Sequence, residues 1–100
     1  MQRTGGAARG AMLRADAEVL GLRALQYLAE TDALEPFCAE SGIAREDLAR
    51  RASEPDLLAA VLDFVLQDDS RLLGLCDATD IRPETVVAAR RRLPGATPDP

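Results

Sequence analysis

The sequence predicts an all-α protein, a compact bundle of about six short helices in one domain. Composition, an internal repeat and regularly spaced helix boundaries predict this class. Hydrophobic residues make up 47% of the chain and aromatic residues only 3%, so the core must be built from Leu, Val, Ile and Ala, which favours helices over strands. One hundred residues suffice for a single core. We expect a disordered leader over 1–14, a helical domain over 15–94 and a flexible tail over 95–100.

An internal repeat predicts how the helices are arranged. Identical residues occur in pairs whose members are separated by the same number of positions along the chain. Because most of these pairs are apolar, they predict two pseudo-repeated three-helix units, each of which needs the other to bury its apolar face. The matched residues are Leu20 with Leu58, Leu28 with Leu66, Leu34 with Leu72, Cys38 with Cys76, Ile43 with Ile81 and Glu46 with Glu84.

Start and stop residues delimit three helices in the first half. Asp16 and Asp32 are residue types that cap helix N-termini. Gly42 is the residue type that closes a helix, because it accepts a left-handed backbone. Pro36 lies only a few residues into the second helix, which must therefore begin irregularly or kink. These signals place helices over 16–30, 32–42 and 45–52.

The second half carries the same kind of signals. Ser53 precedes Pro55, as a capping hydroxyl precedes a proline in a first helical turn. Either Asp69 or Ser70 caps the next helix, and Asp80 takes the turn position that Gly42 holds in the first half. Three further helices are predicted over 54–66, 70–79 and 83–93.

The helix over 54–66 is predicted to be the central one, because its apolar residues cover most of its surface. The predicted core residues are Leu22, Leu25, Leu28, Phe37, Cys38, Ile43, Leu48, Leu58, Val61, Leu62, Val65, Leu66, Leu72, Leu75, Cys76, Ile81, Val86 and Leu93.

Four stretches of the chain resemble a known family. They are ALQYLAE at 24–30, FCAESGI at 37–43, DLARRASEPDLLAAVLDFVLQDD at 47–69 and IRPETVVAARRRLPG at 81–95. They resemble the bacterial domain-of-unknown-function family numbered 3572, found mainly in alphaproteobacteria. The resemblance implies a small helical cytoplasmic protein, and it transfers no catalytic or binding residue.

The missing residue types argue against an enzyme. All twelve basic residues are Arg, and the chain has no His, which excludes Ser–His and Cys–His pairs, Schiff-base lysines and the P-loop lysine. The remaining chemistry is that of carboxylates binding a divalent ion, but their spacing matches no ligand loop. We predict no catalytic residue, no metal ligand and no cofactor, and we interpret these acids as caps and solvated side chains. The acids considered are Asp63, Asp68, Asp69, Asp77 and Asp80.

Nucleic-acid binding is the alternative function. Residues 70–93 match a helix-turn-helix-like unit, with Asp80 in the turn and Arg82, Arg91 and Arg92 as its candidate phosphate contacts. Any two short helices that meet at a corner need a turn residue between apolar anchors, so packing alone explains the pattern. A net charge of −5 repels a polyanion. Binding to another protein is therefore the preferred interpretation, and a homodimer is a second form of it.

Compartment and membrane contact follow from what the chain lacks. Its longest uninterrupted apolar run, 57–62, is far shorter than the about 20 residues of a membrane span. The two Cys residues have no paired or metal-binding spacing and fit a reducing compartment. We expect a cytoplasmic protein without membrane contact. The leader has the basic composition of a transit peptide, but we interpret it as disordered, and Met12 is a second candidate start.

Overall fold

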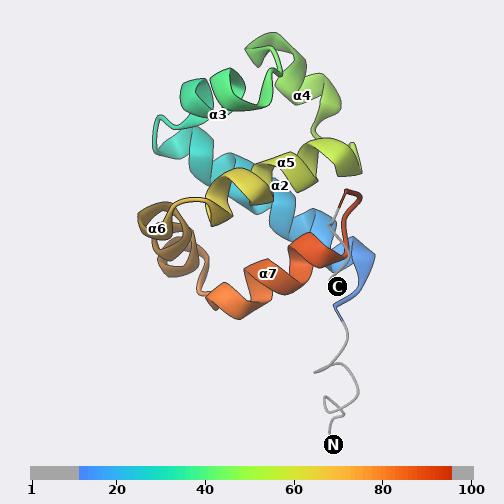
Figure 1. Ribbon diagram of the computed structural model, residues 1–100, viewed down its shortest axis with the longest axis vertical. Coiled ribbons are helices and arrows are strands. Elements are labelled where there is room, and N and C mark those ends of the chain that lie inside the picture. Colours follow the sequence, from blue (N-terminus) through green and yellow to red (C-terminus); the bar gives the residue numbers. More distant parts are fainter. Residues whose placement is uncertain (1–11, 96–100) are drawn as a thin grey trace, which may run out of the picture.

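The computed structural model describes residues 12–95, which fold into a helical bundle (Figure 1). This range contains six α-helices, one 3₁₀ turn and no strand, so the all-α prediction is confirmed. Residues 1–11 of the predicted leader and 96–100 of the predicted tail lie outside the described range. The elements are α2 (Arg14–Glu30), α3 (Leu34–Ser41), η1 (Arg45–Asp47), α4 (Leu48–Arg51), α5 (Pro55–Leu66), α6 (Asp69–Thr79) and α7 (Pro83–Arg91).

Helices α2 and α5 pack against each other at the centre of the bundle, and the other elements surround this pair (Figure 1). Helix α7 packs against both of them on one side. Helices α3 and α4 lie on the other side, where α3 contacts α2 and α5. Helix α6 contacts α2, α5 and α7. Residues of α2 are therefore brought against the corner between α6 and α7, which is far away in sequence.

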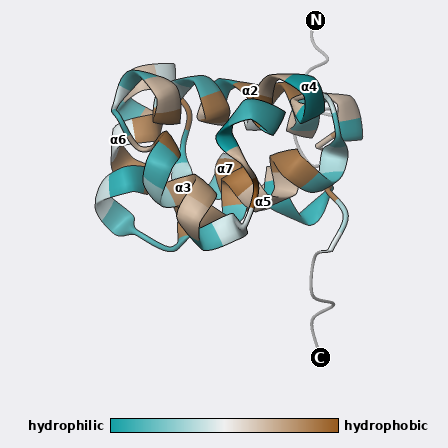
Figure 2. Cartoon of the chain, turned by 90° about the horizontal axis from the view of Figure 1, so that it is seen from above, coloured by the Kyte–Doolittle hydropathy of each residue, from teal (hydrophilic) through white to brown (hydrophobic). Residues whose placement is uncertain are grey.

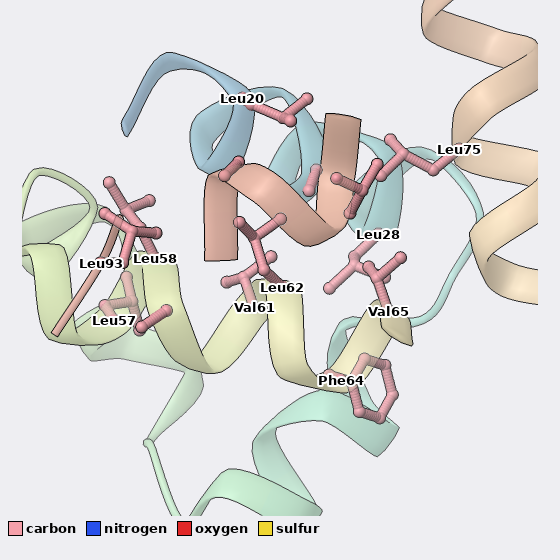
Figure 3. Packing of buried hydrophobic residues seen from close by; sticks show 14 of the residues in the cluster. Leu20, Leu28, Leu57, Leu58, Val61, Leu62, Phe64, Val65, Leu75 and Leu93 are labelled. Carbon is pink, nitrogen blue, oxygen red and sulfur yellow. The ribbon is translucent and has the colours of Figure 1, made fainter. Parts of the chain in front are cut away.

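Helix α5 forms the middle of the core, as the sequence predicts. Most of its side chains are buried, and Asp63 is exposed. Figure 3 shows side chains of α5 surrounded by Leu20 and Leu28 of α2, Leu75 of α6 and Leu93 beyond α7. The buried residues of α5 are Leu57, Leu58, Ala59, Val61, Leu62, Phe64 and Val65.

The prediction that Leu22 lies in the core is wrong, because its side chain is 40% exposed. The buried stripe of α2 runs through Ala17, Leu20, Ala24 and Leu28, and at about 100° per residue Leu22 falls on the far side of the helix. Other predicted core residues lie at the edge of the core and are only partly buried. They are Leu25, Cys38, Ile43, Leu66, Leu72, Cys76 and Ile81.

A glycine allows the two central helices to approach closely. A β-carbon built on Gly21 of α2 would lie 2.8 Å from the Cβ of Leu58 on α5, which is closer than two carbon atoms can pack. Gly21 costs about 1 kcal/mol of helix propensity relative to Ala, and here it makes room for Leu58, which is only 1% exposed.

Several predicted helix caps are wrong in detail. Helix α2 begins at Arg14, before the predicted cap Asp16. Asp32 does not cap α3: its φ of 58° places it in the left-handed region, which Asp tolerates better than most residues, so it lies in the turn after α2. Ser53 makes no capping bond, and Glu54 occupies the N-cap position of α5. Asp68, rather than Asp69 or Ser70, caps α6 by accepting a hydrogen bond from the backbone N–H of Arg71.

The second helices of the two predicted units end in the same way. Gly42 follows α3 with φ 79°, and its N–H donates to the carbonyl of Cys38. Asp80 follows α6 with φ 57°, and its N–H donates to the carbonyl of Cys76. These positions correspond in the sequence repeat. The third helices differ, because α4 has 4 residues and α7 has 9.

Polar and apolar residues divide along the helices in a way that fits burial in a bundle. Figure 2 shows brown apolar stretches on α5 and teal polar stretches on the helices around it. None of the helices within residues 12–95 is long and apolar enough to cross a membrane.

Candidate functional site

Two neighbouring surface hollows lie between one side of α2 and the corner formed by α6 and α7. One is apolar and has a volume of about 200 Å³, the other is polar and has a volume of about 420 Å³, and Arg23 lines both. We call the two hollows together the corner groove. Met12, Asp16, Val19, Leu20, Arg23, Ile81 and Thr85 line the apolar hollow, and Arg23, Gln26, Tyr27, Glu30, Ala78, Thr79 and Asp80 line the polar hollow.

The α2 side of the corner groove is one stripe of a helix. Val19, Arg23, Gln26 and Glu30 are spaced by three or four residues, so their side chains share one flank. Val19 is 53% exposed, which is high for a residue of its size beside an apolar hollow. Leu20 is 5% exposed and forms the floor of that hollow. The flank therefore offers apolar surface at one end and polar groups at the other.

The opposite side of the groove is the α6–α7 corner. The hydroxyl of Thr79 donates to the carbonyl of Leu75 at 2.7 Å, which turns this side chain back onto its own helix. Asp80 then reverses the chain in the left-handed region and leaves its carboxylate exposed at the groove. Ile81 follows and is half-buried between the core and the apolar hollow. The tight corner thus presents an acidic and an apolar side chain next to each other.

Acidic groups outnumber basic ones along the corner groove. Among the described residues that line it, Asp16, Glu30 and Asp80 are the carboxylates and Arg23 is the one basic residue. All four side chains are exposed, so water screens each charge, and their main effect is a negative potential over the groove.

The candidate phosphate contacts lie at the two ends of α7. Arg82 is the N-cap residue of α7, Arg91 is its last residue and Arg92 follows it. All three side chains are exposed, but a nine-residue helix separates Arg82 from the other two by roughly 13 Å. Glu84 lies exposed in the first turn next to Arg82. The fold therefore does not bring the three arginines into one patch.

The neighbouring Arg90 has a structural role. Its Nε donates to the Oδ1 of Asp63 at 2.5 Å and its Nη2 donates to Oδ2 at 3.1 Å, which is a two-bond pair between α7 and α5. Its Nη1 donates to the carbonyls of Leu93 and Pro94 at 3.3 and 3.1 Å. Arg90 therefore fixes the turn that seats Leu93 in the core.

The acids considered as metal ligands are dispersed in the described part of the chain. Asp63 binds Arg90 and Asp68 caps α6. Between residues 12 and 95, no three His, Cys, Asp or Glu side chains come together in an arrangement that would hold a metal ion.

The two cysteines are free thiols at the edge of the core. Burial, and after it the charge of Glu84, raises the pKa of the Cys76 thiol above its ordinary value. A raised pKa lowers the thiolate fraction at neutral pH, and the thiolate is the nucleophile. Cys76 is therefore a weak nucleophile in the folded protein.

Comparison with known proteins places the chain in a family. Residues 14–96 match the model of the family described as protein of unknown function (DUF3572). The chain belongs to this family. No curated protein and no solved structure gives a match. The DUF3572 match begins at the first residue of α2 and covers every helix that the structure describes, so the corner groove lies within the matched region, apart from Met12.

Sequence reasoning missed the corner groove because its two sides are far apart in the chain. One local signal was present. Gly74 interrupts the apolar pattern in the middle of α6, and a glycine in a helix interior often marks the close approach of another group. That group is Tyr27, whose side chain also lines the polar hollow.

Proposed function

We propose that the protein is a non-enzymatic helical module of the cytoplasm that binds another protein. The observation that carries the proposal is the corner groove, where the exposed apolar side chain of Val19 lines an apolar hollow next to a polar one that carries two carboxylates, those of Glu30 and Asp80. Partly exposed apolar groups inside a polar rim are typical of protein interaction sites.

The residue types present support binding rather than catalysis. The chain has neither His nor Lys among its 100 residues, and Cys76 is held largely in its thiol form. The carboxylates at the corner groove are exposed. Catalytic carboxylates, by contrast, are usually buried or lie beside a close charged partner. Two free cysteines in the described range support the cytoplasmic assignment.

Capture of partners by the tagged full-length protein tests the proposal. We compare the wild type with Val19→Asp, which places a charge beside the apolar hollow, and with Leu73→Asp as a matched control. Leu73 is 59% exposed on α6 and does not line the groove. Circular dichroism verifies that each variant folds.

We expect a stoichiometric protein that survives nuclease treatment, is retained by Leu73→Asp and is lost with Val19→Asp. A partner that Val19→Asp also retains would keep the interaction module but move it to another surface. Absence of any stoichiometric protein would overturn the proposed function.

Nucleic-acid binding is the alternative, supported by the exposure of Arg82, Arg91 and Arg92 on or beside α7. Fluorescence anisotropy with duplex DNA at low salt tests it. Binding that weakens steeply with added salt and is lost in Arg91→Gln/Arg92→Gln would favour this alternative. A flat titration would end it.

A further inference from the structure

We propose that the corner groove binds an exposed segment of a partner protein in which a bulky apolar side chain is flanked on both sides by Lys or Arg residues. The inference rests on the proposed function and adds the surface and the chemistry of what it binds. It combines the size of the apolar hollow with the distribution of charge around it.

The apolar hollow has room for one side chain rather than for a whole ligand. Its volume of about 200 Å³ is below the roughly 300–1,000 Å³ of small-molecule sites. Leu20 forms a buried floor, and Val19 and Ile81 supply apolar contact on opposite sides. A side chain seated here would remove the apolar surface of Val19 from water, as a single anchor residue does at the centre of many interfaces.

Carboxylates lie at both ends of the groove. Asp16 lies at the apolar hollow, and Glu30 and Asp80 lie at the polar hollow, with Arg23 between them. The net charge of the whole chain, −5, has the same sign. A basic segment is therefore attracted before contact and oriented along the groove, and an acidic segment or a nucleic acid is repelled.

The length of the groove defines the segment. Asp16 and Glu30 are separated by roughly 21 Å of helix axis. About six or seven extended residues span that distance. An anchor residue with basic residues on each side is therefore long enough to reach carboxylates at both ends.

Three synthetic peptides of about 12 residues test the proposal. Each is titrated into the isotope-labelled full-length protein, and binding is followed by the shifts of its amide NMR signals. The first has a central Leu flanked by Lys residues in a Gly–Ser background. The second replaces Leu by Ala, and the third replaces each Lys by Glu. We expect the first peptide to cause saturable shifts at Val19, Arg23, Thr79 and Ile81. The Ala peptide should bind about fivefold more weakly or worse, and the Glu peptide should not bind.

Protein variants separate the two contributions. Val19→Asp should weaken binding of the Leu–Lys peptide about tenfold. Glu30→Gln/Asp80→Asn should weaken it about threefold or more, and Asn keeps the left-handed turn at residue 80. Leu73→Asp should bind as the wild type does, because it adds the same charge outside the groove.

Other occupants would contradict the proposal in recognisable ways. Groove shifts that depend on protein concentration without peptide would identify a second copy as the occupant. A large gain in peptide affinity on Arg3→Gln/Arg9→Gln would identify the leader. Shifts that lie elsewhere, or equal affinity for the Lys and Glu peptides, would also overturn it. If these outcomes occur while a partner is still captured by Val19→Asp, the proposed function stands and only the groove assignment fails.

Discussion

The hydroxyl of Tyr27 on α2 lies over the backbone of Gly74 on α6, in the space that a β-carbon at position 74 would occupy. The contact brings the two helices together at the end of the bundle where α6 meets α2. Tyr27 also lines the polar hollow of the corner groove. The same side chain therefore sets the position of α6 and forms one wall of the candidate site.

Gly74→Ala is expected to destabilise the protein by about 1–3 kcal/mol, because the added methyl group would overlap the Tyr27 hydroxyl. The same substitution in an unobstructed helix interior would stabilise by about 1 kcal/mol. Urea unfolding of the variant measures the difference. Tyr27→Phe/Gly74→Ala should recover part of the loss, since the ring carbon Cζ remains 3.1 Å from the added carbon.

The single variants Gly74→Ala and Tyr27→Phe form a double-mutant cycle with the double variant. A coupling free energy above about 0.5 kcal/mol is expected for groups in direct contact. If Gly74→Ala unfolds at the same urea concentration as the wild type, Tyr27 does not occupy this space.

The sequence predicts the helices well because their signals are local. The apolar pattern of α5 follows from its own residues, and Gly42 and Asp80 end their helices through backbone conformations that these residue types accept. Helix starts are harder to predict, because one Asp can serve either as a cap or as a turn residue. Asp32 was expected to cap α3 but lies in the turn after α2.

The candidate site is less predictable for a different reason. Val19 and Ile81 line the same hollow although one is on α2 and the other follows α6. Their proximity depends on how α2 packs against the second half of the chain. Glycines inside α2 and α6 indicate close packing, but the sequence does not say which side chain fills the space. The prediction that Leu22 lies in the core fails for a related reason. Apolar residues cover a broad arc of α2, and the packing of the neighbouring helices decides which part of that arc is buried.

Arg90→Ala is expected to cost about 1–3 kcal/mol, whereas Asp63→Asn should cost less than about 1 kcal/mol. The Arg90 side chain is 13% exposed and that of Asp63 is 50% exposed. Removing Arg90 also frees the carbonyls of Leu93 and Pro94 that hold the turn after α7. Thermal unfolding measures both variants, and about 1 kcal/mol corresponds to a shift of about 4–8 °C in a domain of this size.

Arg91→Ala serves as the control for this pair, since Arg91 is exposed on the same helix and its loss should change stability by less than about 0.5 kcal/mol. Equal losses for Arg90→Ala and Asp63→Asn would mean that the ion pair dominates and that the carbonyl contacts contribute little.

The two equivalent corners should respond to alanine in the same direction but to different degrees. Gly42→Ala adds a β-carbon to a residue at φ 79° and should destabilise by about 1 kcal/mol. Asp80 at φ 57° already has a β-carbon, so Asp80→Ala loses only the short polar side chain that tolerates the left-handed region and should cost less than about 1 kcal/mol. The Gly42 site has open space around a built β-carbon, so the cost there comes from the backbone alone. Asp80→Asn should be nearly neutral, because Asn accepts this conformation. Urea unfolding measures all three.

Asp77→Ala is the matched control for the corners, because Asp77 is exposed within α6 and its replacement should stay within about 0.5 kcal/mol of the wild type. A neutral result for Gly42→Ala would show that the corner relaxes out of the left-handed region when the glycine is absent.

Cys76 should react more slowly with iodoacetamide in the folded protein than in urea, measured at pH 8 in a Cys38→Ala background. Burial, and after it the charge of Glu84, raises the pKa of this thiol, so the folded protein retains a proton that the unfolded chain releases. The unfolded state therefore binds fewer protons as the pH rises past the ordinary thiol pKa, and the stability of the fold falls there. Below that pH the contribution of Cys76 to stability is fully present.

Glu84→Gln should lower the pKa of the Cys76 thiol and speed its alkylation. Glu40→Gln, a change of the same kind on α3, should do neither. Equal rates in the folded and unfolded protein would show that Cys76 is open to solvent.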